Sequence, residues 1–287
     1  MYYLLIILSV IIFGGCFFLQ DKYRQRCGSN LKISLQFSLT SSIFGLIALF
    51  CINGCKVEFT PFTLIMSMLS ALNGIGFTFC SFKALGIINL SLFSLFSMLG
   101  GMLLPFLQGI IFFGEGITWA KIICVILITV ALILTVEKGD KRKGTIYYAG
   151  IFILNGMSGV LSKIFTSAPF EKASPEGYSI LSALCTIILC FIILLIFFRE
   201  KDENAKPRIS TLAISAGSGI FNRLANLILV IALSHVDASV QYPMVTGGVM
   251  IVSTLICFFG DKKPSKREIL SIIVSFAGML ALFAIPV

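Results

Sequence analysis

Long apolar runs separated by short polar joints recur along the whole chain. They cover roughly residues 2–19, 31–52, 61–82, 88–113, 118–136, 145–165, 177–198, 209–233, 238–259 and 267–286. Each run holds about 20 residues, which as a helix is enough to cross the ~30 Å hydrocarbon core of a bilayer. The runs are continuous rather than alternating, which favours helices over the strands of a membrane barrel. The pattern therefore predicts ten transmembrane helices.

One stretch of the chain occurs twice. Gly100-Gly101 runs on to a Phe-Phe-Gly-Glu ending at Glu115, and Gly247-Gly248 runs on to a Phe-Phe-Gly-Asp ending at Asp261. The separation of the two copies is about half of the 287 residues. Self-similarity at such a period indicates a duplicated unit. We therefore expect two five-helix repeats, residues 1–143 and 144–287.

Composition supports the membrane assignment. Hydrophobic residues make up 57% of the chain, charged residues only 12%, and the mean hydropathy is +1.02. That leaves too little polar material to cover a water-soluble fold. The nine cysteines show no Cys-x-x-Cys spacing, so we interpret them as reduced small residues and expect neither disulfides nor a metal or other cofactor.

Basic residues are concentrated in alternate joints. The joints after the first, third, fifth, seventh and ninth runs hold most of the 22 Lys and Arg residues, and the other joints hold few. This explains the net charge of +9 without nucleic acid as a partner. By the positive-inside rule the basic joints are cytoplasmic in a multi-pass cell-membrane protein, with both termini outside. An odd number of spans per repeat makes the two repeats inverted copies, a common plan of secondary transporters.

These features resemble the EamA branch of the drug/metabolite transporter superfamily. The likeness covers essentially the whole chain, and the second copy, from Tyr242-Pro243 through Gly247-Gly248 to Asp261, is the closer match to the family pattern. The resemblance implies a ten-helix carrier with a central cavity and alternating access. Proteins of that family are usually drawn with both termini in the cytoplasm, so the charge bias and the resemblance predict opposite orientations, and both stay open at this point.

Arg223 is the leading candidate for a substrate-binding residue. It lies about midway along the run 209–233, where an arginine costs roughly 2.5–3.5 kcal/mol on insertion scales. Its planar donors suit a carboxylate or phosphate. Asn226 follows three residues later and Asn222 is adjacent, so both join the candidate site. The alternative is a structural arginine bonded to the backbone carbonyls of a broken helix.

Other candidates come from polar residues inside apolar runs. Asn155 heads a polar stripe with Ser158 and Ser162, and Gln241 and Tyr242 stand beside a proline that interrupts the ninth run. We include Asn155, Gln241 and Tyr242 in the predicted substrate site, because interrupted helices expose backbone to a substrate in carriers. The serines of the second run are interpreted as small packing residues.

The absence of acidic residues from the interiors of the runs disfavours a proton antiporter of cationic drugs. A basic or neutral cavity instead favours anionic, zwitterionic or uncharged solutes. We expect a secondary transporter of a small organic metabolite such as an amino acid or sugar, with the lipid bilayer and a coupling ion or proton as further partners. The alternatives are a multidrug or lipid-linked solute exporter and a non-transporting membrane scaffold or sensor. No enzyme motif supports catalysis, and the sequence does not determine the oligomeric state.

Overall fold

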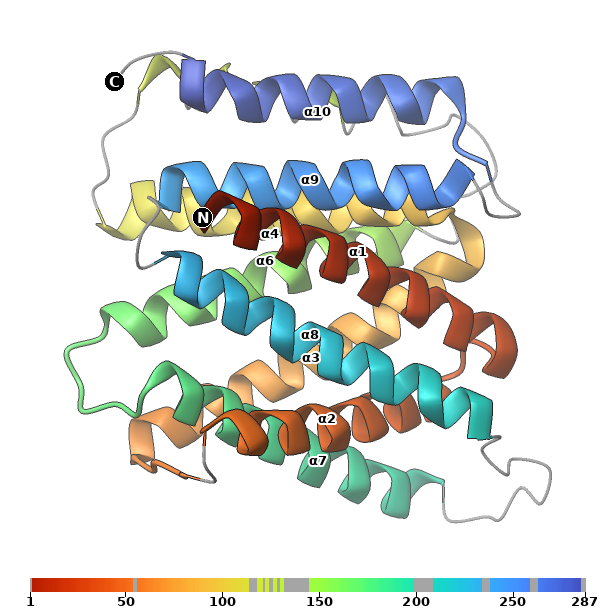
Figure 1. The fold of residues 1–287 in the computed structure, drawn as a ribbon, viewed down its shortest axis with the longest axis vertical. Coiled ribbons are helices and arrows are strands. Elements are labelled where there is room, and N and C mark those ends of the chain that lie inside the picture. The colour runs from red at the N-terminus through yellow and green to blue at the C-terminus, as the bar shows by residue number, and fades with distance from the viewer. Residues whose placement is uncertain are drawn as a thin grey trace.

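The protein is all-helical over the part of the chain that this computed structural model describes, which is residues 2–53, 56–113, 118–120, 122–123, 126–127, 130–131, 145–198, 209–233, 238–258 and 263–284. These residues form nine long helices and no strand (Figure 1). The helices are α1 (Tyr2–Cys27), α2 (Leu31–Asn53), α3 (Pro61–Ile87), α4 (Leu90–Phe113), α6 (Thr145–Ser167), α7 (Pro175–Phe197), α8 (Ile209–Leu233), α9 (Ala238–Phe258) and α10 (Lys266–Ala284). The predicted helical class is confirmed.

Helix boundaries follow the apolar runs closely, except where polar residues extend a helix. The first run predicts a helix over 2–19, yet α1 continues to Cys27. Its last turns are held by Asp21, which accepts hydrogen bonds from Arg24 Nε at 2.9 Å and from Gln25 Nε2 at 2.8 Å. Such pairs, three and four residues apart, stabilise a helix that has left its apolar segment. Hydrophobicity alone therefore predicted too early an end.

Two helices begin with the same local signal. Thr60 precedes α3 and Ser174 precedes α7, and each side chain accepts a hydrogen bond from the backbone N–H three residues later. Proline occupies the next position in both, as Pro61 and Pro175. A hydroxyl cap and a proline in the first turn satisfy or remove N–H groups that the helix cannot use. These starts are therefore encoded locally.

Five of the described helices are long and apolar enough to cross a membrane, namely α1, α2, α3, α6 and α7. The protein is thus compatible with embedding in a bilayer. The fifth predicted span, 118–136, lies mostly outside the described residues. Glu115 and Asp261, which end the two repeated motifs, lie outside them as well.

Helices of the two predicted repeats pack against each other throughout the bundle. α1 packs on α8 and on α9, while α6 packs on α3 and on α4. α2 packs on α8 and α3 packs on α7. The pairs α2 with α7 and α4 with α9 also pack together. Exchanging α1 with α6, α2 with α7, α3 with α8 and α4 with α9 reproduces this list of main packing pairs. α10 packs mainly on α9 at one side of the bundle (Figure 1).

Two glycines allow the backbones of crossing helices to come into contact, and in both crossings the helices belong to opposite predicted repeats. A Cβ at Gly100 of α4 would lie 2.0 Å from the backbone oxygen of Phe152 in α6. A Cβ at Gly219 of α8 would lie 2.0 Å from the backbone oxygen of Ser41 in α2. Small residues permit this close approach in helix bundles without a polar core. The second crossing brings α8 against α2 one turn before Arg223.

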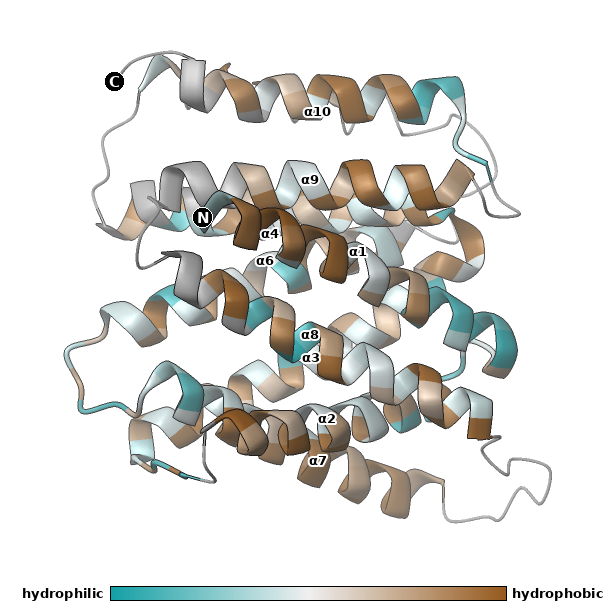
Figure 2. Cartoon of the chain, viewed as in Figure 1, coloured by the Kyte–Doolittle hydropathy of each residue, from teal (hydrophilic) through white to brown (hydrophobic). Residues whose placement is uncertain are grey.

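Described basic residues are concentrated at one end of the bundle. α1 ends, α2 begins, α3 ends and α10 begins at this end, whereas α1 begins and α10 ends toward the other (Figure 1). Hydrophilic residues gather at the end of α1 and the start of α10 (Figure 2). The described basic residues there include Lys22, Arg24, Arg26, Lys266 and Arg267. The joint between α1 and α2 and the start of α10 therefore lie at the same end of the bundle.

Candidate functional site

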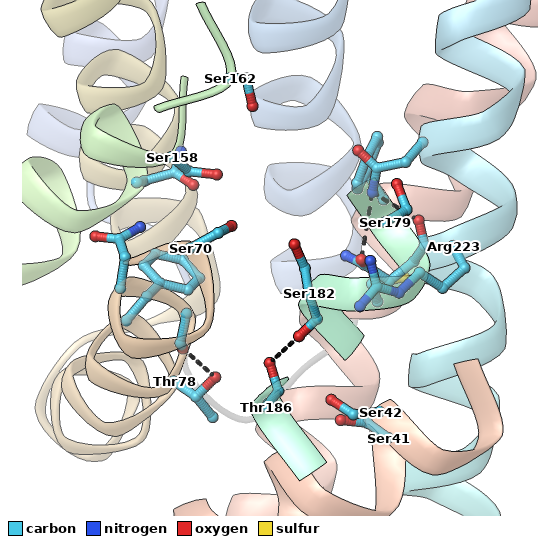
Figure 3. A pocket seen from close by; sticks show the side chains of 18 of the residues that line it. Ser41, Ser42, Ser70, Thr78, Ser158, Ser162, Ser179, Ser182, Thr186 and Arg223 are labelled. Atoms are coloured by element: carbon cyan, nitrogen blue, oxygen red, sulfur yellow. Dashed lines mark hydrogen bonds between the residues drawn. The ribbon is translucent and has the colours of Figure 1, made fainter. Parts of the chain in front are cut away.

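A central cavity of about 690 Å³ lies between the helices. It is lined by residues of α1, α2, α3, α4, α6, α7, α8 and α9, so both predicted repeats contribute to it. Figure 3 shows one wall formed by Ser70 and Thr78 of α3 with Ser158 and Ser162 of α6, and the facing wall carries Arg223. The volume is typical of a site for a small organic molecule.

Four of the six predicted site residues line this cavity. They are Arg223, Asn222 and Asn226 on α8 and Asn155 on α6. The side chains of Gln241 and Tyr242 lie outside the described residues, although both positions fall within α9. The structure therefore brings together the α8 and α6 candidates, which are far apart in the sequence.

Arg223 lies near the middle of α8, and its side chain packs closely against α2. The contact is at Gly45 of α2: a Cβ added to that glycine would lie 3.0 Å from the Cγ of Arg223. No carboxylate of the described residues lies within ion-pairing distance of the guanidinium, and the described ion pair, Arg24 with Asp21, is far from it at the end of α1. The hydroxyl of Tyr178 on α7 lies close enough to Arg223 to interact with it electrostatically, but it is a neutral group. Arg223 is thus a cation facing a cavity without an anionic partner in the described chain.

Asn155 and Asn73 form a pair of amides on the opposite wall. The Nδ2 of Asn155 donates to the backbone oxygen of Ser97 at 2.6 Å. The Nδ2 of Asn73 donates to the backbone oxygen of Leu154 at 2.8 Å. Each amide nitrogen uses one of its two hydrogens on a neighbouring helix, so its second N–H and the amide oxygen remain. We call this side the amide wall; it can both donate to and accept from a molecule in the cavity opposite the Arg223 cation.

A stripe of hydroxyls on α7 was missed by the sequence analysis. Tyr178, Ser182 and Thr186 follow each other at intervals of four residues and all line the cavity, together with Ser179. The Oγ of Ser182 is buried and has no hydrogen-bond partner in the described chain, while Thr186 Oγ1 donates to the Ser182 backbone oxygen at 2.8 Å (Figure 3). The spacing is itself a helical signal and could have identified this face.

The serines of α2 divide between two roles. Ser34 keeps to the helix, because its Oγ donates to the Leu31 backbone oxygen at 2.8 Å. Ser38, Ser41 and Ser42 line the cavity instead, and Ser38 Oγ is buried without a partner in the described residues. These three serines thus border the cavity, while the backbone of Ser41 also forms the close crossing with Gly219 of α8. The packing interpretation of this stripe stays a prediction.

Charge is scarce in the cavity. Among its described lining residues only Arg223 and Glu176 are charged, and Glu176 lies in the first turn of α7. No group of three or more His, Cys, Asp or Glu side chains among the described residues could hold a metal ion. Phenylalanines complete the wall, namely Phe13, Phe17, Phe37, Phe77 and Phe165. The site therefore combines many neutral hydroxyl and amide side chains with an aromatic lining and little charge.

The cavity extends to one end of the bundle only. At the end where α6 gives way to α7 its lining includes Thr166, Pro175 and Glu176, which are terminal residues of those helices. At the other end the last lining residues of α1 and α3 are Gln20 and Thr78, about two turns before those helices end. We call the first the Thr166 end and the second the Tyr23 end, after the residue of α1 that lies beyond Gln20.

Comparisons with known proteins show a shared fold. No family model matches the chain, and no curated protein matches it. Among solved structures 28 chains match. One of them, described only as a crystal structure of a protein, superposes with a TM-score of 0.63 over 96% of this chain and 94% of that chain, at 19% sequence identity. The helical arrangement is therefore one that a solved structure also adopts over nearly its whole length.

Proposed function

We propose that the protein is a secondary transporter that binds a small anionic or zwitterionic organic solute in the central cavity, with Arg223 as the anchor for the acidic group. The observation that carries the proposal is Arg223 itself, which faces a cavity of about 690 Å³ with no carboxylate partner among the described residues. A charge this deep in an apolar bundle is costly unless something compensates it. A substrate carboxylate or phosphate would provide that compensation through the two parallel donors of the guanidinium.

The rest of the cavity suits a solute that also carries hydrogen-bond donors. Asn73 and Asn155 line the cavity across from Arg223, and each keeps an amide oxygen and one N–H that its backbone partner does not use. Hydroxyls of Ser38 and Ser182 are buried without partners in the described chain. Unpaired buried polar groups are costly and are usually satisfied by a ligand or water. Amino acids, hydroxy acids, sugar acids and sugar phosphates all combine an acidic group with donors.

The ten-helix inverted repeat belongs to the same proposal. The main packing pairs are unchanged when α1 to α4 are exchanged with α6 to α9, as expected for two copies of one unit related by a twofold axis. The cavity lies between these halves, where carriers of this plan bind their substrate. This arrangement supports the assignment of residues 1–143 and 144–287 to two repeats and a likeness to the EamA-type drug/metabolite transporters.

The proposed location is a cell membrane with the basic joints in the cytoplasm. Lys22, Arg24, Arg26, Lys266 and Arg267 lie at the Tyr23 end, and cytoplasmic loops carry an excess of lysine and arginine. In that orientation the cavity opens away from the cytoplasm and both termini lie outside. A coupling ion or proton is a further partner of such a carrier, whereas catalysis and nucleic-acid binding are not part of the proposal.

A multidrug or lipid-linked solute exporter is the second candidate. The observation that favours it is the aromatic lining, with Phe13, Phe17 and Phe77 facing the same cavity as Arg223. Aromatic walls bind diverse apolar molecules without specific hydrogen bonds. The two candidates differ in what Arg223 does, because an apolar drug needs no guanidinium.

The experiment that tests the proposal is a thermal-unfolding screen of the purified protein. The ligands are gluconate, glucose 6-phosphate and glutamate, with glucose as the neutral control and tetraphenylphosphonium as the apolar cation. A solute that binds only the folded state raises the melting temperature by mass action. At a concentration 100 times its Kd it adds roughly 2.7 kcal/mol to the free energy of unfolding. We expect at least one anion to stabilise the wild type and to lose that effect in Arg223→Gln.

Arg24→Gln is the matched control, because Arg24 pairs with Asp21 at the end of α1 and is not among the cavity-lining residues. It should keep the full response to the anion. If Arg223→Gln is folded and responds as strongly as the wild type, Arg223 is a structural residue and the proposed anchor is wrong. Stabilisation by tetraphenylphosphonium alone, unchanged in Arg223→Gln, would favour the exporter.

A further inference from the structure

An aromatic cluster closes the Tyr23 end of the cavity. The ring of Tyr23 on α1 lies 5.0 Å from that of Phe37 on α2 and 6.0 Å from that of Phe82 on α3, and the rings of Phe37 and Phe82 are 5.2 Å apart. All three side chains are buried, and Ile214 of α8 packs against them. The cluster thus joins four helices directly below the last lining residues of α1 and α3.

A second aromatic pair borders the open Thr166 end. The ring of Phe165 on α6 stacks on that of Tyr178 on α7 at 4.3 Å. Met66 of α3 packs in the same cluster, and Phe62 of α3 stacks on the outer face of Phe165 at 6.1 Å. Phe165 and Tyr178 both line the cavity.

The two clusters occupy equivalent positions in the two halves. Tyr23 and Phe165 lie near the ends of α1 and α6, and Phe37 and Tyr178 lie near the starts of α2 and α7. Each member lies about half the chain length from its counterpart, and so does Ile214 of α8 from Met66 of α3. Under the exchange that relates the packing pairs, Tyr23–Phe37–Ile214 therefore corresponds to Phe165–Tyr178–Met66.

The equivalent clusters are in different states. At the Tyr23 end α1 contacts α3, and Phe82 bridges the gap between them. The corresponding contact at the Thr166 end would join α6 to α8, and the described residues of these two helices make no such contact. One end is therefore closed across the cavity and the other is open along the wall that carries Arg223.

Tyr178 connects the second cluster with the binding site. Its ring stacks on Phe165, while its hydroxyl lies near Ser70, Ser182 and the Arg223 guanidinium. An anion bound to Arg223 would lie between these groups and could accept a hydrogen bond from that hydroxyl. Binding would then favour a position of α7, and of Phe165 with it, closer to α8, because a ligand shifts a conformational equilibrium toward the state that binds it better.

From these relationships we propose that the two aromatic pairs are the alternating gates of the cavity. Tyr23 and Phe37, with Phe82, form the gate that is closed in this structure. Phe165 and Tyr178 form the gate that closes the Thr166 end when α6 and α7 move toward α8, as the Tyr23 cluster opens. This inference rests on the proposed transport function, but its test below needs neither a substrate nor transport.

The test measures access to a cysteine in the cavity from each face of the membrane. Ser158 is suitable, because it is exposed and lines the cavity midway along α6. Ser158→Cys is treated with a membrane-impermeant trimethylammonium methanethiosulfonate in right-side-out and inside-out vesicles. Peptide mass spectrometry separates modification at position 158 from modification of the native cysteines. We expect modification from one face only.

Phe37→Ala in the same background should add modification from the second face, roughly tenfold or more above the background of Ser158→Cys alone, as a shift of about 1.4 kcal/mol in a gate equilibrium implies. Tyr23→Leu, which removes a ring and keeps an apolar side chain, provides a second variant in case Phe37→Ala does not fold. Tyr178→Ala is the matched control at the equivalent position, and it should leave modification confined to the original face.

Folded Phe37→Ala and Tyr23→Leu proteins that both stay inaccessible from the second face would overturn the gate assignment. So would access from the second face in Tyr178→Ala. The results separate the two proposals. If the cysteine becomes accessible as described but no anion stabilises the protein, the proposed function alone is contradicted. If an anion stabilises the protein through Arg223 but the cysteine accessibility does not change, this inference alone is contradicted.

Discussion

The side chain of Arg223 crosses α2 at Gly45, where an added Cβ would lie 3.0 Å from Arg223 Cγ and 3.2 Å from the backbone oxygen of Gly219. The missing side chain at position 45 therefore helps to set the direction of the guanidinium. A glycine of α2 that contributes no polar atom is in this way part of the candidate site.

Gly45→Ala should weaken anion binding without unfolding the protein. The new methyl group requires the stem of Arg223 to move by a few tenths of an ångström, and misplacement of a charged donor on this scale reduces the strength of a paired hydrogen bond. We expect the anion-dependent rise in melting temperature to fall by more than half. Gly15→Ala is the control, because nothing lies within 4 Å of a Cβ at that position; a full response in Gly45→Ala would show that α2 does not position Arg223.

Gly219→Ala should lower stability. Its Cβ would lie 2.0 Å from the backbone oxygen of Ser41, so α2 and α8 would have to separate. Overpacking of this kind typically costs about 1–3 kcal/mol. Gly15→Ala should instead be neutral or stabilising, since alanine favours a helix interior over glycine by roughly 0.5–1 kcal/mol. The two variants are compared by thermal unfolding, and equal melting temperatures would contradict the close crossing.

Asn155→Leu tests the amide wall. The substitution removes the donation to Ser97 and the polar amide of a residue that lines the cavity. An interhelical hydrogen bond in a membrane protein contributes only about 0.6 kcal/mol on average, so we expect the fold to persist. Binding of gluconate or glutamate should weaken severalfold, measured as a higher concentration for half-maximal stabilisation. An unchanged concentration dependence would make Asn155 a packing residue.

The loop before α7 should respond to acid through Glu58. The backbone N–H of Ser174 donates to Glu58 Oε2 at 2.5 Å, and this bond lowers the pKa of Glu58 from its ordinary value of 4.5. A lowered folded-state pKa contributes stability that is complete above the unfolded pKa and is lost as pH falls through the folded one. Between pH 6 and pH values well below 4.5 the wild type should therefore lose stability that Glu58→Gln does not lose. Parallel melting curves for the two proteins would contradict this role.

The sequence predicts the helices well because their causes are local. Apolar runs, the Thr60 and Ser174 caps and their prolines define most ends, and the α8 bounds coincide with the predicted run 209–233. Arg223 was found because a cation inside an apolar run is conspicuous. Its environment was not predictable, since the contact with Gly45 and the approach of Tyr178 depend on how three helices pack.

The cavity-facing hydroxyls of α2 and α7 could not be assigned from the sequence for a different physical reason. Serine and threonine are small enough to serve packing or a wet cavity equally well, so the serines of α2 do not reveal their role until the face they occupy is known. Ser38, Ser41 and Ser42 face the cavity, whereas Ser34 bonds to its own helix. The spacing of Tyr178, Ser182 and Thr186 identifies a face of α7, but only the packing against α2 and α3 identifies what that face meets.

The most direct test of the account is exchange of a labelled anion across a membrane. Proteoliposomes containing wild type, Arg223→Gln or Arg24→Gln are loaded with unlabelled gluconate or glucose 6-phosphate, whichever raises the melting temperature, and uptake of the same radiolabelled solute is followed. The account predicts exchange by wild type and Arg24→Gln and its loss in folded Arg223→Gln. Equal exchange by all three proteins, or none by a wild type that binds the anion, would contradict it.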